Sequence, residues 1–203
     1  FAACTVVAYI GLFFVCNFKV LSPGANDNLT GVFVAVSALK CLKESGIRYE
    51  NTEVCALLTG SEEAGLRGAT AFTKRHKGEN KDVETYIIAF DTMRDYDYMT
   101  IYHRDMTGMV KNSPEVVALL DEACNDPDVN HPLPHGVVPF GASDAAAFSR
   151  GGFKAAAVAG QNPKYAPYYH NRRDTPDQMI PETFALGLDI ALAAIEAFDR
   201  DQK

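Results

Sequence analysis

TYIIAFD, residues 85–91, is a short apolar run that ends on an acid. A run of this length, rich in Tyr, Ile and Phe and without alternation, is typical of a strand that is buried on both faces. Such strands occur in parallel sheets whose two faces are covered by helices. The run therefore predicts an α/β fold, with Asp91 at the carboxyl end of a buried strand.

The rest of the chain alternates between similar runs and helical periodicity. Residues 53–59 (EVCALLT) and 154–159 predict two more buried strands, and residues 98–103 alternate as a half-buried strand does. Apolar residues at helical spacing predict helices over residues 28–45, 64–77, 113–124 and 181–198. We expect three layers, with a mostly parallel mixed sheet and helices on both of its faces.

Length and composition fit one globular domain. The chain has 203 residues, of which 47% are hydrophobic and 22% charged, and this length suits a single domain over residues 1–203. Nineteen basic against 26 acidic side chains give a formal charge of -7, which argues against nucleic acid as a partner, because nucleic-acid binding requires a basic face. The five cysteines form no C-x-x-C pair, so neither a zinc ribbon nor a disulfide framework is expected.

Residues 1–16 form an apolar run without a charged side chain. A signal peptide is disfavoured, since the run lacks an initiator Met, a basic region and a small-residue cleavage site. Two interpretations stay open: two buried strands that break at Gly11, or the end of a membrane segment, which in full needs about 20 apolar residues. We expect residues 1–20 to be a fragment of an insertion or of a buried strand region. Membrane association through this segment is a further expectation, and the compartment stays undetermined.

Acidic and imidazole side chains gather where predicted strands end and helices begin. Asp27 lies in a turn that opens a helix, Glu62 and Glu63 follow one apolar run, Asp91 ends another, and His170 precedes the last helix. Ligands bind at the carboxyl ends of strands in such sheets, and carboxylates with imidazole bind divalent metal ions. Each residue also has a structural interpretation, as a helix cap, a turn residue or a surface hydrogen-bonding group. The residues alone leave these alternatives open.

Five motifs resemble, in order and spacing, those of the M28 family of zinc aminopeptidases. They are SPGANDNLTG, TGSEEAGLRGA, IIAFDTMRD, GASDAAAFSRGG and YYHNRRDTPDQM, which together run from Ser22 to the last helix. The resemblance implies a zinc exopeptidase-like fold, a peptide substrate and one or two Zn²⁺ ions as cofactor.

The resemblance also implies roles for the polar residues. Asp27 matches the carboxylate that bridges two zinc ions, and the other metal ligands match Glu63, Asp91 and His170. Glu62 matches the catalytic base, which takes a proton from the attacking water and returns it to the leaving amine. Tyr169 is the expected hydrogen-bond donor to the developing oxyanion.

Two more acids are expected to act indirectly. Asp144 and Asp174 lie in the last two motifs, where a carboxylate can accept hydrogen bonds that orient metal ligands.

One departure from the family pattern concerns a further zinc ligand, a His in an H-x-D motif upstream of the bridging Asp. The residues before SPGAND read CNFKVL, and the first His of the chain is His76. Either Asn17 and Lys19 occupy the positions of the motif, which gives a degenerate site, or the motif lies upstream of Phe1. We prefer the second explanation, and both stay open.

These observations predict a zinc-dependent aminopeptidase that removes N-terminal residues from peptides. A site that lacks one imidazole is expected to retain the ion at Glu63 and His170 more readily than the ion at Asp91. Two alternatives stay open. One is a catalytically inactive binding domain of the same fold, and the other is a glutaminyl-cyclase-type acyltransferase, which the absence of Trp disfavours. The sequence predicts no oligomeric state.

Overall fold

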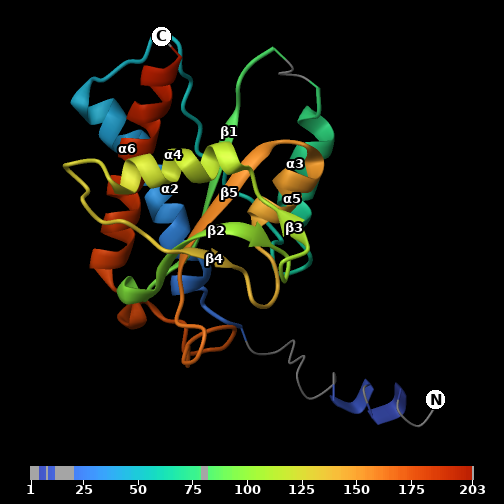
Figure 1. The fold of residues 1–203 in the computed structure, drawn as a ribbon. Helices are drawn as coiled ribbons and strands as arrows, with labels where there is room; N and C mark the ends of the chain where they lie inside the picture. Colours follow the sequence, from blue (N-terminus) through green and yellow to red (C-terminus); the bar gives the residue numbers. More distant parts are fainter. Residues whose placement is uncertain (1–4, 8, 12–20, 79–81, 203) are drawn as a thin grey trace.

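The computed structural model describes residues 5–7, 9–11, 21–78 and 82–202 (Figure 1). Its described residues form a mixed sheet of five strands, which are β1 (Tyr86–Met93), β2 (Met99–Asp105), β3 (Val110–Lys111), β4 (His135–Val137) and β5 (Lys154–Gly160). β5 lies between β1, to which it is parallel, and β2, to which it is antiparallel. β2 also pairs antiparallel with β3 and parallel with β4. β1 therefore stands at one edge of the sheet and β5 in its interior.

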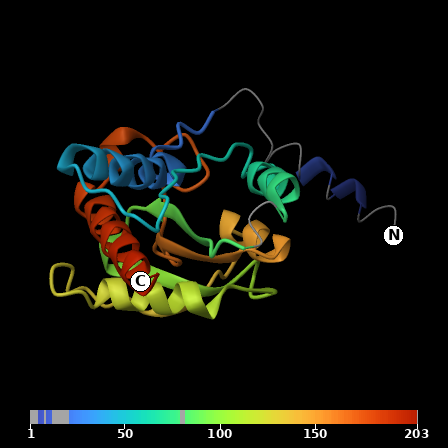
Figure 2. The same cartoon turned by 90° about the horizontal axis from the view of Figure 1, so that it is seen from above.

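Helices cover both faces of this sheet, as Figures 1 and 2 show. One face carries α2 (Thr30–Ser45), α4 (Pro114–Cys124) and α6 (Pro181–Asp201), and the other carries α3 (Arg67–His76) and α5 (Asp144–Gly151). The connections contain the short helices η1 (Ala25–Leu29), η2 (Tyr96–Tyr98) and η3 (Pro176–Gln178). The predicted three-layer α/β fold is confirmed.

The packing of β1 explains why its sequence is apolar throughout. Ile88 and Phe90 pack into the core on the side of α2, α4 and α6, whereas Ile87 and Ala89 pack on the side of α3 and α5. Successive side chains of a strand point to opposite faces, so a strand covered on both sides needs apolar residues at every position. Burial of a large aliphatic side chain in such a core contributes about 1.5–3 kcal/mol to stability.

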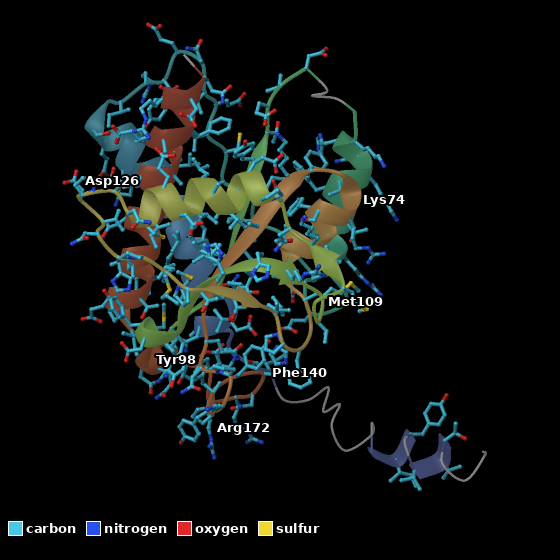
Figure 3. All side chains as sticks on the ribbon, viewed as in Figure 1. Lys74, Tyr98, Met109, Asp126, Phe140 and Arg172 are labelled. Atoms are coloured by element: carbon cyan, nitrogen blue, oxygen red, sulfur yellow. The ribbon has the colours of Figure 1, made fainter. Side chains whose placement is uncertain are left out.

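Local signals in the sequence account for the ends of the helices. The Ser113 hydroxyl accepts a hydrogen bond from the backbone N–H of Val116 at 3.4 Å, and Pro114 follows as the first residue of α4. α2 ends at Gly46, whose φ of 75° is a left-handed conformation that glycine adopts without steric cost. In Figure 3, Lys74 in the last turn of α3 points away from the sheet, and its side chain is exposed.

One prediction about the fold is wrong, and one helix was not predicted. Residues 53–59 do not form a strand, and their side chains are exposed or half-exposed, with Leu58 at 54%. Helix α5 was not predicted, because its sequence DAAAFSRG is short and rich in alanine.

The described part of the N-terminal run is helical and exposed, at residues 5–7 and 9–11. The interpretation as buried strands is therefore wrong for these residues, and residues 1–4, 8 and 12–20 lie outside the described residues. Within the described part of the chain, none of the helices combines the length and the apolar character needed to cross a membrane.

Candidate metal centre

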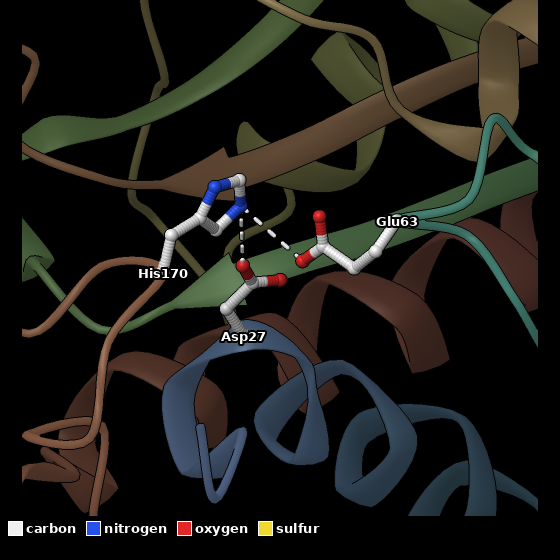
Figure 4. A group of neighbouring side chains, drawn as sticks. All are labelled: Asp27, Glu63 and His170. Carbon is white, nitrogen blue, oxygen red and sulfur yellow. Dashed lines mark ion pairs between the residues drawn. The ribbon is translucent and has the colours of Figure 1, made fainter. Parts of the chain in front are cut away.

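Three segments that are far apart in the sequence bring Asp27, Glu63 and His170 together. Nε2 of His170 lies 3.2 Å from Oδ2 of Asp27 and 3.2 Å from Oε1 of Glu63 (Figure 4). One ligand atom from each of the three residues falls within 4.8 Å of the others. Asp27 comes from η1, Glu63 from the turn before α3, and His170 from the connection between β5 and η3. We call these three residues the triad.

The backbone around Asp27 is held by Asp174. The carboxylate of Asp174 accepts hydrogen bonds from the backbone N–H of Asn26 at 2.8 Å, from the side-chain amide of Asn26 at 2.7 Å, and from the backbone N–H of Asp27 at 3.0 Å. Asp174 is only 1% exposed and Asn26 is fully buried. A carboxylate that accepts several N–H groups away from water fixes their geometry firmly, so Asp174 orients the turn that carries Asp27.

Asn28 ties the same turn to the carboxyl end of β1. Its side-chain amide donates to the carbonyl oxygen of Phe90 at 2.8 Å, and its Oδ1 accepts from the backbone N–H of Thr92 at 3.1 Å. Gly31 allows this close approach, because a Cβ at this position would lie 2.2 Å from the carbonyl oxygen of Phe90. Sequence reasoning did not single out Asn28, although it lies within the motif SPGANDNLTG.

A tight turn presents Glu62 and Glu63. The carbonyl oxygen of Glu62 accepts from the backbone N–H groups of Gly65 at 2.8 Å and Leu66 at 2.7 Å. Gly68 packs directly against the start of the turn, where an added Cβ would meet the carbonyl oxygen of Gly60 at 2.5 Å. The turn leaves the Glu63 side chain 61% exposed at the triad, while Glu62 is half-buried.

The connection that carries His170 is anchored through Asp95. One oxygen of this buried carboxylate accepts from the hydroxyl of Tyr168 at 3.1 Å and from the backbone N–H of Asn162 at 2.8 Å. The ring of Tyr169 stacks on His170, with centroids 3.8 Å apart and an interplanar angle of 21°. Neither Asp95 nor Tyr168 was predicted, since their contacts join residues more than 60 positions apart.

Contacts within the triad shift the pKa values of its three side chains. Hydrogen bonding to Asp27, followed by hydrogen bonding to Glu63, raises the pKa of His170 to about 10. The hydrogen bond with His170 lowers the pKa of Glu63. Burial raises the pKa of Asp27 in spite of its contact with His170.

Glu62 and Asp91 are the two acids beside the triad, and their negative charges repel each other and the carboxylates of the triad. Burial, and then the charge of Asp91, raise the pKa of Glu62 to about 8. Burial, and then the charge of Asp27, raise the pKa of Asp91 to about 7. Such mutual repulsion among carboxylates is the condition that a divalent cation relieves.

The donor set of the triad fits a zinc ion. Zinc binds imidazole nitrogen and carboxylate oxygen, and ligands about 2.1 Å from a tetrahedral zinc lie about 3.4 Å from one another. The two distances of 3.2 Å at His170 Nε2 are close to this value. In addition, Oδ1 of Asp144 is buried without a hydrogen-bond partner among the described residues, while Oδ2 of the same side chain accepts from the hydroxyl of Thr59.

The structure does not place all the predicted ligands in one group. Asp91 lies in β1 and outside the triad. Its carboxylate accepts a hydrogen bond from the hydroxyl of Thr92 at 3.1 Å. Tyr169 and Glu62 are close enough for the acids of the site to raise their pKa values, after burial as the main cause. The triad contains three of the four residues that the motifs singled out as metal ligands.

The sequence matches a known family of proteins. Residues 12–195 match the model of Peptidase family M28. A probable leucine aminopeptidase of the fungus Arthroderma otae is 29% identical over 173 residues, which cover 81% of this chain and 45% of the relative.

Solved structures show the same fold. An aminopeptidase from Aneurinibacillus sp. strain AM-1 is similar with a TM-score of 0.70 and 25% identity, over 86% of this chain and 39% of that one. BSAP, a zinc aminopeptidase from Bacillus subtilis, gives a TM-score of 0.71 and 22% identity, over 86% of this chain and 42% of that one. The chain thus spans less than half of the length of each of these relatives. Since the family match extends over most of the sequence, the chain belongs to peptidase family M28.

Proposed function

We propose that this protein is a zinc-dependent aminopeptidase whose triad binds the metal. The observation that carries the proposal is the position of His170 Nε2, at 3.2 Å from carboxylate oxygens of both Asp27 and Glu63. Membership of a peptidase family supports hydrolysis of peptides. The zinc aminopeptidase from Bacillus subtilis, with its similar fold, supports zinc as the metal.

The triad is the stronger of two metal positions in this proposal. It offers one imidazole and two carboxylates, which suffice for a catalytic zinc site with an open position. A second ion between Asp27 and Asp91 would have carboxylates alone among the described residues, and zinc prefers nitrogen or sulfur ligands as well. We therefore expect the first ion to bind more tightly than the second.

The side chains around the triad divide the remaining work. When bound, zinc polarises a carbonyl group and lowers the pKa of water. Glu62 lies next to Glu63 but outside the triad, so its carboxylate stays free to accept a proton from water and to pass it to the leaving amine. The raised pKa of Tyr169, caused mainly by burial, keeps its hydroxyl protonated as a hydrogen-bond donor.

The surplus of acids favours a substrate with a free amino terminus. The charges of Asp27, Asp91 and Asp144 all help to raise the pKa of Glu62. The combined negative potential of these acids attracts a protonated amine. An N-acetylated peptide lacks that charge and is expected to be a poor substrate.

The test combines zinc content with hydrolysis of leucine p-nitroanilide by the longest product of the gene. Glu62→Gln should lower kcat by about 100-fold or more, because it removes the proton carrier, while zinc content stays at the wild-type value. Glu44→Gln, a change at an exposed acid of α2, is the matched control and should alter neither quantity. Equal loss of zinc and activity in Glu62→Gln would contradict the role of this residue, and equal hydrolysis of N-acetyl-leucine p-nitroanilide would contradict the aminopeptidase assignment.

A further inference from the structure

Asp105, the last residue of β2, is a fully buried acid that the proposed function does not use. Its carboxylate forms no ion pair among the described residues, and its partners are Met106 and Ser143. Burial of a charge without a basic partner is costly unless hydrogen bonds compensate for the lost water. The residues that donate to Asp105 are therefore held in fixed positions.

Asp105 joins the turn after β2 to the start of α5. Its Oδ1 accepts from the backbone N–H of Met106 at 2.6 Å and from the backbone N–H of Ser143 at 3.0 Å, and its Oδ2 accepts from the hydroxyl of Ser143 at 2.5 Å. Ser143 is the N-cap of α5, where its hydroxyl accepts from the N–H of Ala145 at 3.2 Å. The buried carboxylate thus fixes where α5 begins.

The start of α5 in turn holds the segment that leads to the metal centre. Asp144 is the first residue of α5, and its Oδ2 accepts a hydrogen bond from the hydroxyl of Thr59. Thr59 directly precedes the turn that presents Glu62 and Glu63. A displacement of the start of α5 would therefore displace the entry to this turn.

The exit of the same turn also rests on α5. The turn ends where α3 begins, and α3 lies beside α5 in Figures 1 and 2. The rings of Phe72 and Phe148 meet edge to face with centroids 5.9 Å apart. A Cβ added at Gly151 would lie 2.7 Å from Cβ of Thr73, so the two helices are in close contact. Both ends of the turn are thus supported by the helix that Asp105 fixes.

Glu63 is the member of the triad that depends most on its backbone for position. Its side chain is 61% exposed, whereas that of Asp27 is 13% exposed. Loss of a group that supports a metal ligand from outside the site typically weakens metal binding by about 10–100-fold. A residue that holds the turn of Glu63 can therefore change the affinity of the site without contacting the metal.

The charge of Asp105 also reaches the site. Burial is the main cause that raises the pKa values of Asp144 and Asp91, and the negative charge of Asp105 contributes to both. A negative potential favours a cation. Tests of Asp105 must therefore separate its hydrogen bonds from its charge.

We propose that Asp105 is a positioning residue of the candidate metal centre, which holds the turn of Glu63 through Ser143 and the start of α5. The proposal rests on the proposed function, since it assumes that the triad binds zinc. Asp105 has no hydrogen bond or ion pair with the triad among the described residues, so it acts through the backbone of its neighbours.

The first test measures the zinc Kd of Asp105→Asn by competition with a chelator, in the longest product of the gene. The substitution replaces one acceptor oxygen with a donor NH₂ group, and Kd should rise by about tenfold. Ile101→Val shortens a fully buried side chain of the same strand on the face opposite α5, and Asp128→Asn removes a charge from an exposed acid between α4 and β4. Both controls should keep the wild-type Kd. An unchanged Kd in Asp105→Asn, or an equal rise in Ile101→Val, would overturn the proposal.

The second test follows the turn itself in metal-free protein, by hydrogen exchange measured with NMR. The backbone N–H groups of Gly65 and Leu66 donate to the carbonyl oxygen of Glu62 and should exchange about fivefold or more faster in Asp105→Asn. The N–H of Tyr169, which donates to Ala166 in the connection that carries His170, is the internal control and should exchange at the wild-type rate. Equal acceleration at all three amides would indicate a general loss of stability and would overturn the proposal. This measurement needs no zinc, so it decides the role of Asp105 even if the triad binds no metal.

A double-mutant cycle separates the contacts of Asp105 from its charge. Thr59→Val removes the hydroxyl that donates to Asp144 and leaves the charge of Asp105 in place. Since Asp105→Asn and Thr59→Val interrupt the same series of contacts, together they should raise the zinc Kd by less than the product of their separate effects. A rise equal to that product would show that Asp105 acts by its charge alone and would overturn the proposal.

Ser143→Gly keeps the test decisive if Asp105→Asn fails to fold. Glycine is tolerated at an N-cap, so this variant removes the hydroxyl that donates to Asp105 and retains the backbone contact. It should accelerate exchange at Gly65 and Leu66 and raise the zinc Kd by about threefold, since one of several supporting contacts is lost. Wild-type exchange and Kd in Ser143→Gly would overturn the proposal.

Discussion

β5 and β1 have similarly apolar sequences and different surroundings. β5 pairs with a strand on each side, and residues 155–158 are buried. β1 pairs with β5 alone among the described strands, and residues 86–91 are all half-buried. The burial of a strand thus depends on its neighbours as well as on its own residues. We call β5 with β2, β3 and β4 the closed half of the sheet, and the outer side of β1 with residues 53–59 the open edge.

The triad joins these two parts of the molecule. His170 follows β5 and is anchored through Asp95, at the closed half. Glu63 follows residues 53–59, at the open edge, and its side chain is 61% exposed. Asp27 lies between them and is 13% exposed. The side chain of Asp27, whose turn is supported by the buried Asp174, is therefore held more firmly than that of Glu63.

Core truncations should show the largest contrast between the two parts. Ile101→Ala in β2 removes a fully buried side chain and should lower the free energy of unfolding by about 3 kcal/mol. Leu58→Ala at the open edge removes a side chain that is 54% exposed and should change it by less than about 0.5 kcal/mol. Urea unfolding of the 203-residue chain measures both values. Similar losses in the two variants would mean that residues 53–59 already belong to the core.

Asp174→Asn tests whether the buried carboxylate beneath the turn of Asp27 positions the triad. The substitution replaces one acceptor oxygen of the carboxylate with an NH₂ group, which is a donor. The N–H groups of Asn26 and Asp27 therefore lose part of their hydrogen bonding. We expect the zinc Kd to rise by about 10–100-fold, measured by competition with a chelator on protein whose circular dichroism is unchanged.

Asp177→Asn is the matched control for this substitution. Asp177 lies three residues further on, is exposed, and has no contact with the triad. The zinc Kd of the Asp177→Asn variant should therefore equal that of the wild type. An unchanged Kd in Asp174→Asn would show that Asp27 is held by other contacts.

Tyr168→Phe should have the smallest effect. It removes the hydroxyl that donates to Asp95, while Asn162 and Arg94 continue to contact the same carboxylate. The free energy of unfolding should fall by about 1 kcal/mol, and the zinc Kd should rise less than in Asp174→Asn. Tyr98→Phe, at a tyrosine that is 42% exposed, should change neither. If the zinc Kd rose more in Tyr168→Phe than in Asp174→Asn, the contact of Tyr168 with Asp95 would matter more for zinc binding than the contacts of Asp174.

The elements that sequence reasoning identified are those with strong local patterns. Residues 85–91 and 154–159 predicted β1 and β5, because apolar runs require burial whatever the partner. Residues 53–59 carry the same pattern, but a strand also needs a partner, which the described residues do not supply. The pattern itself was therefore informative where the assignment was wrong.

The site was predictable in part for a similar reason. The motifs identified Asp27, Glu63 and His170 because their residue types suit a metal ion and their positions match a family pattern. The supports of the site depend on contacts between distant segments, such as the hydrogen bond of Asn28 with Phe90. No local pattern records such a contact, so Asn28 and Asp95 emerged from the structure alone.

The most direct test of the triad is a crystal structure of this chain grown with zinc, with anomalous diffraction measured at the zinc edge. The account predicts a zinc peak at about 2.0–2.2 Å from Oδ2 of Asp27, Oε1 of Glu63 and Nε2 of His170. It would be contradicted by a triad that keeps its direct contacts without a peak, or by zinc bound only elsewhere, for example at His135 and Asp121, which lie 2.7 Å apart.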